Sequence, residues 1–205
     1  MKDCFNEQIN RKNTNSVKWQ KQKYSDALPF WVADSDYPTS SLIKEKLQEV
    51  ALNSIFGYDL IPTRFNEAVS LWYKRYNSIV NPTWVIPMTG VVLEIRVILD
   101  ILTNEGDGVI LQTPVYHTFH KLIRGMKRNI IENKLIKKDD TYIMNLDNLE
   151  ELFKQGYKVL ILCSPHNPVG RMWSKEELSQ VVKLAKKYSA YIISDEIHSD
   201  INITD

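Results

Sequence analysis

Short apolar runs alternate with longer amphipathic segments from residue 84 to residue 194. The runs consist mainly of valine, isoleucine and leucine, which is typical of strands buried on both faces of a parallel sheet. The pattern predicts strands at residues 84–88, 108–112, 129–133, 158–163 and 191–194. It predicts helices at residues 91–102, 118–125, 146–155 and 174–188. Strands that are joined through helices indicate the α/β class.

The chain before residue 84 has a weaker pattern. Residues 1–28 are polar and carry few apolar anchors, so we expect an arm or an irregular lead-in. Residues 29–38, with the sequence PFWVADSDYP, form a short apolar burst followed by turn residues. Beyond them, the spacing of apolar residues predicts helices at residues 42–53 and 64–76.

Two local signals add detail to this picture. Ser174 and Glu177 have the spacing of a capping box, which predicts that a helix begins there. The two cysteines, Cys4 and Cys163, do not form a disulfide framework. Because Cys163 lies in an apolar run, we expect it to be a buried, reduced thiol.

Composition narrows the classes of function. The chain has 205 residues, of which 25% are charged and 43% hydrophobic, which suits a soluble protein with a sizeable core. A net charge of +1 gives no reason to expect nucleic acid as a partner. No apolar run approaches the length that spans a membrane, and the polar N-terminal residues do not resemble a signal peptide. We therefore expect a cytoplasmic location and no membrane partner.

Polar or glycine-rich residues follow several predicted strands, and ligands of parallel sheets bind beyond the carboxyl ends of strands. Gly90 separates a strand from an apolar helix, so backbone N–H groups there could approach an anion such as a phosphate. An ordinary tight turn is the alternative. Tyr116 lies on a proline-bearing loop and could stack on a planar ligand or simply pack against the protein.

Two further strand ends carry polar side chains. Residues 164–170 contain two prolines whose peptide bonds could be cis, in a stiff turn that would aim Asn167 above the sheet or serve structure alone. Asp195 directly follows a buried strand, and a carboxylate there needs a partner. A protonated ring nitrogen, a buried arginine and a metal ion are all candidates. We expect no metal, because Asp195 and His198 have no third ligand at convincing spacing.

Several motifs, spread over nearly the whole chain, carry a resemblance to a known family. They are KW at residues 18–19, LPFWVADSDYP at 28–38, IFGY at 55–58, TGVV at 89–92, GDGVILQTPVYHTF at 106–119, LCSPHNPVGRMWSKEEL at 162–178 and ISDEIHSDI at 193–201. In this order they resemble class I/II aminotransferase-fold enzymes that use pyridoxal 5′-phosphate. The chain is most similar to the cystathionine β-lyase branch, the C–S lyases of the PatB and MalY type.

This resemblance implies a fold and a division into domains. The expected fold is the three-layer large domain of a fold-type-I pyridoxal-phosphate transferase, with a mainly parallel sheet that is incomplete at the C-terminus. Residues 1–50 would form an N-terminal arm and part of the small domain. Residues 51–205 would form part of the cofactor-binding large domain.

The resemblance also implies roles for single residues in binding the cofactor. Gly90, Val91 and Val92 would hold its phosphate through backbone amides. Tyr116 would stack on the pyridine ring. Asn167 would hydrogen-bond the phenolic oxygen of that ring.

Other roles concern the ring nitrogen, the neighbouring subunit and the substrate. Asp195 would pair with the protonated ring nitrogen, and His198 would lie near the phenolic edge of the ring. Tyr58 would reach the phosphate in the neighbouring subunit, which implies a homodimer. Asp34 would line the substrate entrance.

The implied reaction is the β-elimination of an amino-acid thioether, either cystathionine or another cysteine S-conjugate, to a thiol, pyruvate and ammonia. An aminotransferase of the same family and a non-catalytic remnant or regulatory binding protein are the alternatives.

Leu93-Glu94 and His117-Thr118 depart from the usual pattern around the cofactor. The Schiff-base lysine is expected beyond Asp205. We also expect strands that are absent here to belong inside the sheet, which would leave apolar strand edges unpaired.

Overall fold

The computed structural model describes residues 7, 9–21, 23–24 and 26–201. The chain divides into two compact units, Met1–Phe65 and Asn66–Asp205. The division falls inside helix α3 (Thr63–Lys74). The predicted domain boundary after residue 50 stays a prediction.

Outside its helices, the described part of the first unit is irregular, as predicted for the polar residues 1–28. It contains a one-turn helix, α1 (Val17–Gln20), and a longer helix, α2 (Ser41–Leu52). None of the side chains of α2 is buried. The buried side chain of α1 is a charged one, Lys18, so polar contacts rather than an apolar core organise this segment.

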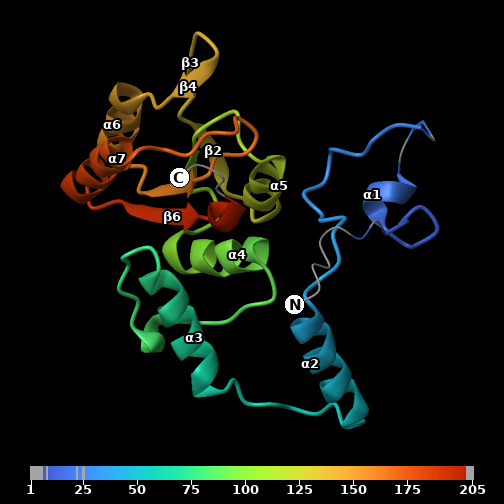
Figure 1. The fold of residues 1–205 in the computed structure, drawn as a ribbon. Helices are drawn as coiled ribbons and strands as arrows, with labels where there is room; N and C mark the ends of the chain where they lie inside the picture. Colours follow the sequence, from blue (N-terminus) through green and yellow to red (C-terminus); the bar gives the residue numbers. More distant parts are fainter. Residues whose placement is uncertain (1–6, 8, 22, 25, 202–205) are drawn as a thin grey trace. The chain divides into compact units, whose positions relative to one another are not determined.

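The second unit is built on a four-stranded sheet (Figure 1). Its strands are β1 (Gly108–Leu111), β2 (Asn129–Glu132), β5 (Val159–Cys163) and β6 (Tyr191–Asp195), in the order β2-β1-β5-β6. Every neighbouring pair is parallel. Helix α4 (Val91–Leu102) precedes β1, and the helices between the strands are α5 (His117–Gly125), α6 (Leu146–Lys154) and α7 (Lys175–Lys187). The predicted α/β class and parallel sheet are confirmed.

Helices cover both faces of the sheet and give three layers. One core cluster joins residues of α4 and α5 to alternate strand residues such as Val109 and Leu111. A second cluster joins residues of α6 and α7 to the strand residue between them, Ile110. Because successive side chains of a strand point to opposite faces, β1 is buried on both sides, as its apolar sequence predicts.

The predicted strand at residues 84–88 is wrong. A 3-10 helix, η2 (Pro82–Trp84), occupies its start, and the Asn81 side chain caps it by accepting a hydrogen bond from the Thr83 N–H at 3.0 Å. Val85 does have an extended backbone, with φ −82° and ψ 118°. No described strand pairs with this segment, so it lacks the hydrogen-bonded neighbour that an extended segment needs to form a sheet.

The sequence pattern also missed a small hairpin. Strands β3 (Ile136–Lys138) and β4 (Thr141–Ile143) pair antiparallel. Asp139, in the two-residue turn between them, has a left-handed backbone with φ 51°, a conformation that aspartate tolerates better than most residues. The strands are short and mostly exposed, so they carry no strong apolar alternation.

Local signals elsewhere are confirmed. The Ser174 hydroxyl accepts a hydrogen bond from the Glu177 N–H at 3.2 Å, and the Glu177 carboxylate accepts one from the Ser174 N–H at 2.8 Å. Cys163 is a free, buried thiol, and burial raises its pKa. Among the described residues, no helix has the length and apolar character needed to cross a membrane.

Candidate functional site

Hydrogen bonds join three of the predicted site loops at one edge of the sheet. Strands β1, β5 and β6 are parallel neighbours, so their carboxyl ends lie at the same edge. The Ser164 N–H donates to the carbonyl of Asp195 at 3.0 Å, which ties the loop after β5 to the end of β6. The His166 ring nitrogen Nε2 lies 2.9 Å from the carbonyl of Pro114, which ties the same loop to the one after β1. The loops that carry Tyr116, Asn167 and Asp195 are therefore held together.

Asp195 is a buried carboxylate to which no described residue offers a cationic partner. It is the last residue of β6 and is 6% exposed. Its Oδ1 atom accepts a hydrogen bond from the Ile197 N–H at 3.1 Å. Among the described residues, it forms no ion pair with lysine, arginine or histidine, and no group of three or more histidine, cysteine, aspartate or glutamate side chains is arranged to hold a metal. The carboxylate is thus available to a cationic ligand.

The loop after β5 presents Asn167. Both predicted candidates for cis bonds, Ser164-Pro165 and Asn167-Pro168, are cis. Backbone hydrogen bonds from the His166 N–H to the Arg171 carbonyl (2.7 Å) and from the Gly170 N–H to the His166 carbonyl (2.8 Å) close the loop. The Asn167 side chain is half-buried and makes no hydrogen bond to a described residue, so both its donor and its acceptor are free for a ligand.

Gly90 precedes α4 in a conformation that suits glycine. Its φ is +136°, so a side chain there would strain the backbone even though a Cβ atom would meet nothing within 4 Å. The N–H groups of Gly90, Val91 and Val92 donate to no described residue, whereas the Leu93 and Glu94 N–H groups both donate to the Gly90 carbonyl at 3.1 Å. Free N–H groups at the start of a twelve-residue helix favour an anion.

Two further predicted site residues lie half-buried in the second unit. Tyr116 precedes α5, and its ring makes edge contacts with His117 and Phe119, with centroids 5.1 and 5.6 Å apart. His198 makes no side-chain hydrogen bond to a described residue. The structure locates both side chains, and their roles stay predictions.

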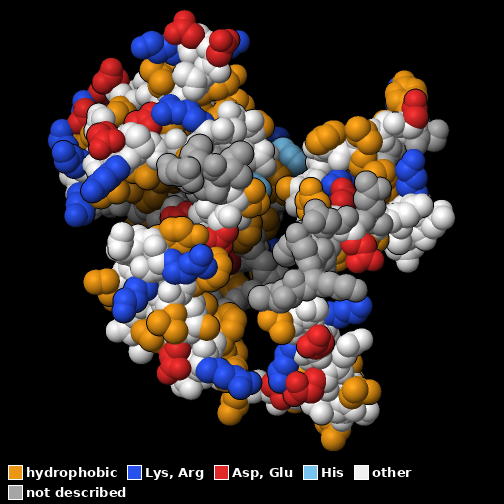
Figure 2. All heavy atoms as spheres, viewed as in Figure 1, with side chains coloured by type: hydrophobic (Ala, Val, Ile, Leu, Met, Phe, Trp, Pro, Cys, Tyr) orange, Lys and Arg blue, Asp and Glu red, His pale blue; other side chains and the backbone are white. Residues whose placement is uncertain are grey.

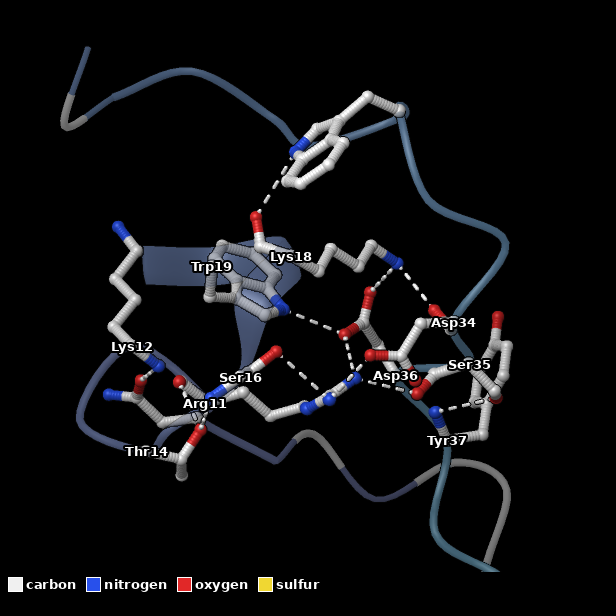
Figure 3. Close-up of polar contacts among 12 residues, drawn as sticks. Arg11, Lys12, Thr14, Ser16, Lys18, Trp19, Asp34, Ser35, Asp36 and Tyr37 are labelled. Carbon is white, nitrogen blue, oxygen red and sulfur yellow. Dashed lines mark hydrogen bonds and ion pairs between the residues drawn. The ribbon is translucent and has the colours of Figure 1, made fainter. Parts of the chain in front are cut away.

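The remaining predicted residues belong to the first unit. Tyr58 lies between α2 and α3, and its side chain is fully exposed. Asp34 belongs to a polar network that joins the arm to residues 34–36 (Figure 3). Its Oδ2 atom accepts a hydrogen bond from Arg11 at 2.7 Å, and its backbone carbonyl accepts one from Lys18 at 2.7 Å.

Asp36 is the centre of this network, and our sequence reasoning did not single it out. Lys18 donates to its Oδ2 atom at 2.6 Å, while Trp19 and Arg11 donate to Oδ1 at 2.8 and 3.0 Å. The hydrogen bond from Lys18, followed by the one from Trp19, lowers the pKa of Asp36 to about 2. The KW and DSD motifs were the available signal, because their lysine and aspartates have opposite charges, although 16 to 18 positions separate them.

The fold and the site together define an α/β protein whose candidate ligand-binding loops, with a buried carboxylate among them, lie beyond the carboxyl ends of its strands. This chain belongs to the aminotransferase class I and II family, whose model matches residues 30–204.

Relatives of known name support the same assignment. The chain is 37% identical over 203 residues to cystathionine β-lyase PatB of Bacillus subtilis, covering 96% of this chain and 52% of that protein. The structure of cystalysin from Treponema denticola, which contains pyridoxal 5′-phosphate, is 34% identical with a TM-score of 0.88, over 96% of this chain and 52% of that one. A C–S lyase from Staphylococcus hominis with bound pyridoxal phosphate is 26% identical with a TM-score of 0.86, over 94% and 50%. The chain spans about half the length of the relatives it matches.

Proposed function

We propose that this chain is part of a pyridoxal-phosphate-dependent C–S β-lyase, which converts cystathionine or another cysteine S-conjugate to a thiol, pyruvate and ammonia. The observation that carries the proposal is the buried Asp195 carboxylate, which ends β6 without a cationic partner among the described residues. The names of PatB and of the S. hominis C–S lyase support the lyase chemistry.

The chain's own groups fit the cofactor. The free N–H groups of residues 90–92 suit its phosphate, and the unpaired Asn167 amide suits its phenolic oxygen. Tyr116 offers an aromatic ring on the loop that is tied to the Asn167 loop. The Asp195 carboxylate would keep the ring nitrogen protonated by pairing with it. In that form the bound cofactor supplies the electron sink for a carbanion at the substrate Cα.

Three features of the whole enzyme belong to the proposal as well. We place the Schiff-base lysine beyond Asp205, since no lysine in the family motifs of this chain matches its position. Asp34 would line the substrate entrance, although Arg11 already binds one of its oxygens. His198 would lie near the phenolic edge of the cofactor.

We further propose that the enzyme is a homodimer. The full exposure of Tyr58 leaves its hydroxyl available to the cofactor phosphate of a neighbouring subunit. Helix α4 supports a second contact surface, because Leu93, Val97 and Ile101 recur every four residues and are 45, 40 and 77% exposed. Figure 2 also shows hydrophobic side chains on the visible surface of α3.

Light scattering of the complete gene product would show twice the monomer mass, and a monomer would contradict the proposal. A cytoplasmic location stays a prediction.

The test of function is pyruvate release from cystathionine by the complete gene product, with pyridoxal phosphate but without a keto acid. We expect turnover under these conditions, and Asp195→Asn should lower it roughly 10²- to 10³-fold because the ring nitrogen loses its charged partner. Asp140→Asn, a matched change at an exposed position, should leave the rate unchanged. Turnover that requires a keto acid would instead identify an aminotransferase.

A further inference from the structure

His166 has a fully buried side chain that takes part in none of the proposed cofactor contacts. It is 1% exposed and lies in the loop after β5, directly before Asn167. Its ring packs edge-on against Trp173, with the centroids 5.4 Å apart. The Trp173 indole N–H in turn donates to the carbonyl of Cys163 at 2.9 Å. Both the backbone and the ring of His166 are therefore held in place.

The partner of His166 defines its tautomer. Nε2 lies 2.9 Å from the Pro114 carbonyl, and a carbonyl oxygen only accepts hydrogen bonds. Nε2 therefore carries a proton and donates. Burial lowers the pKa of His166, while the nearby carbonyls of Pro114 and Cys163 oppose this shift. The ring is thus neutral at pH 7, and its buried Nδ1 atom forms no hydrogen bond to a described residue.

This hydrogen bond spans 52 positions of the chain. Among the described residues, it is the one hydrogen bond between the loop at residues 113–116 and the loop at residues 164–170. Pro114 precedes Tyr116 by two residues, and His166 is the neighbour of Asn167. Without it, no hydrogen bond between described residues would join the two loops directly, and the paired strands β1 and β5 from which they emerge would link them.

We propose that His166 is a positioning residue that holds the loops of Tyr116 and Asn167 at the separation required for both to contact one planar, phosphorylated ligand. The proposal rests on the proposed function, in which these two side chains contact the cofactor ring. His166 itself touches no ligand. Its role is to donate through Nε2 from a buried, neutral ring.

Two substitutions separate this role from simple packing. His166→Gln keeps an amide donor near the place of Nε2, whereas His166→Phe keeps the ring against Trp173 but removes the donor. His120→Phe is the matched control on α5, outside both loops. The probe is pyridoxamine 5′-phosphate, which has the ring and the phosphate but lacks the aldehyde that would react with surface lysines.

Affinity for the probe and amide hydrogen exchange are measured on the complete gene product, freed of bound cofactor, and on its variants. We expect His166→Phe to bind the probe about five- to thirtyfold more weakly, in line with the loss of one buried hydrogen bond, and to exchange faster at both residues 113–116 and 164–170. His166→Gln should stay within about twofold of the unchanged chain. The His120→Phe control should change neither quantity.

The results distinguish the inference from the function on which it rests. If the unchanged gene product binds the probe and His166→Phe only lowers the melting temperature, with affinity and exchange unaltered, the positioning role is overturned. If the unchanged gene product does not bind the probe, the proposed function fails instead. Amide hydrogen exchange then tests whether His166 links the two loops. Faster exchange in His166→Phe alone supports this link, and equal exchange in all variants overturns it.

Discussion

Individual charged side chains organise the arm, whose described residues belong to neither core cluster. Arg11, Lys18 and Trp19 all converge on Asp36, and Arg11 also binds Asp34 (Figure 3). The ion pairs are partly exposed, so each alone adds little to stability, but a shared carboxylate couples them. The family motifs predicted Asp34 as a site residue. They did not reveal Arg11, because its pairing partners lie 23 and 25 positions away.

The lowered pKa of Asp36 predicts how this network responds to acid. Its folded-state pKa of about 2 lies below the ordinary 3.8, so its contribution to stability is complete above pH 3.8 and is lost as the pH falls through about 2. The indole N–H resonance of Trp19, which reports on Asp36, should therefore titrate with a midpoint near pH 2 in NMR spectra. Lys18→Met should move this midpoint upward, since it removes the largest cause of the shift. A midpoint near 3.8 in the unchanged chain would contradict the network.

Helices and strands form as the sequence predicts where local sequence signals match the burial seen in the structure. Helix α4 has its predicted bounds, and β5 is buried along its whole length, as five consecutive apolar residues predict. The segment at residues 84–88 is equally apolar in sequence but has no partner strand among the described residues. Local propensity can make a segment extended, but the segment becomes a strand of a sheet only when it pairs with another strand that is distant in the sequence.

The capping box of α7 predicts a measurable loss of stability. Ser174→Ala should lower the free energy of unfolding by about 1 kcal/mol, because the Glu177 N–H loses its side-chain partner. Urea unfolding, followed by circular dichroism, measures the change. Ser179→Ala, within the same helix, serves as the control and should cause no comparable loss, since alanine favours helix interiors. Equal stability of Ser174→Ala and the unchanged chain would mean that the cap contributes nothing.

For the chain as a whole, the four-stranded sheet has two edge strands, β2 and β6, among the described residues. β6 ends the strand order, and its outer edge pairs with no described strand. Tyr191, at the start of β6, is 57% exposed. This arrangement agrees with the expectation of unpaired apolar edges, which are a template for pairing with other chains.

Self-association through this edge should therefore depend on β6. We expect the 205-residue chain to form open-ended species as its concentration rises, and Tyr191→Lys to reduce them because an edge lysine opposes strand pairing. Light scattering over a concentration series distinguishes these species from a discrete dimer. Val182→Lys, an exposed apolar residue on α7, is the matched control and should have no such effect. Identical association of the two variants would rule out the edge as the cause.

Local sequence accounts for the parallel sheet, the helix between each pair of strands, the capping box and the strand-end positions of Tyr116, Asn167 and Asp195. These depend on residues close together in the chain, whose apolar spacing and hydrogen-bonding groups act over a few positions. Tertiary packing decided the hydrogen bond from His166 to Pro114 and the ion pair of Arg11 with Asp34. It also left residues 84–88 without a partner among the described strands. The reason is that folding brings a side chain close to residues that are distant in the sequence. A periodic pattern of apolar residues does not indicate which of these residues will become its partner.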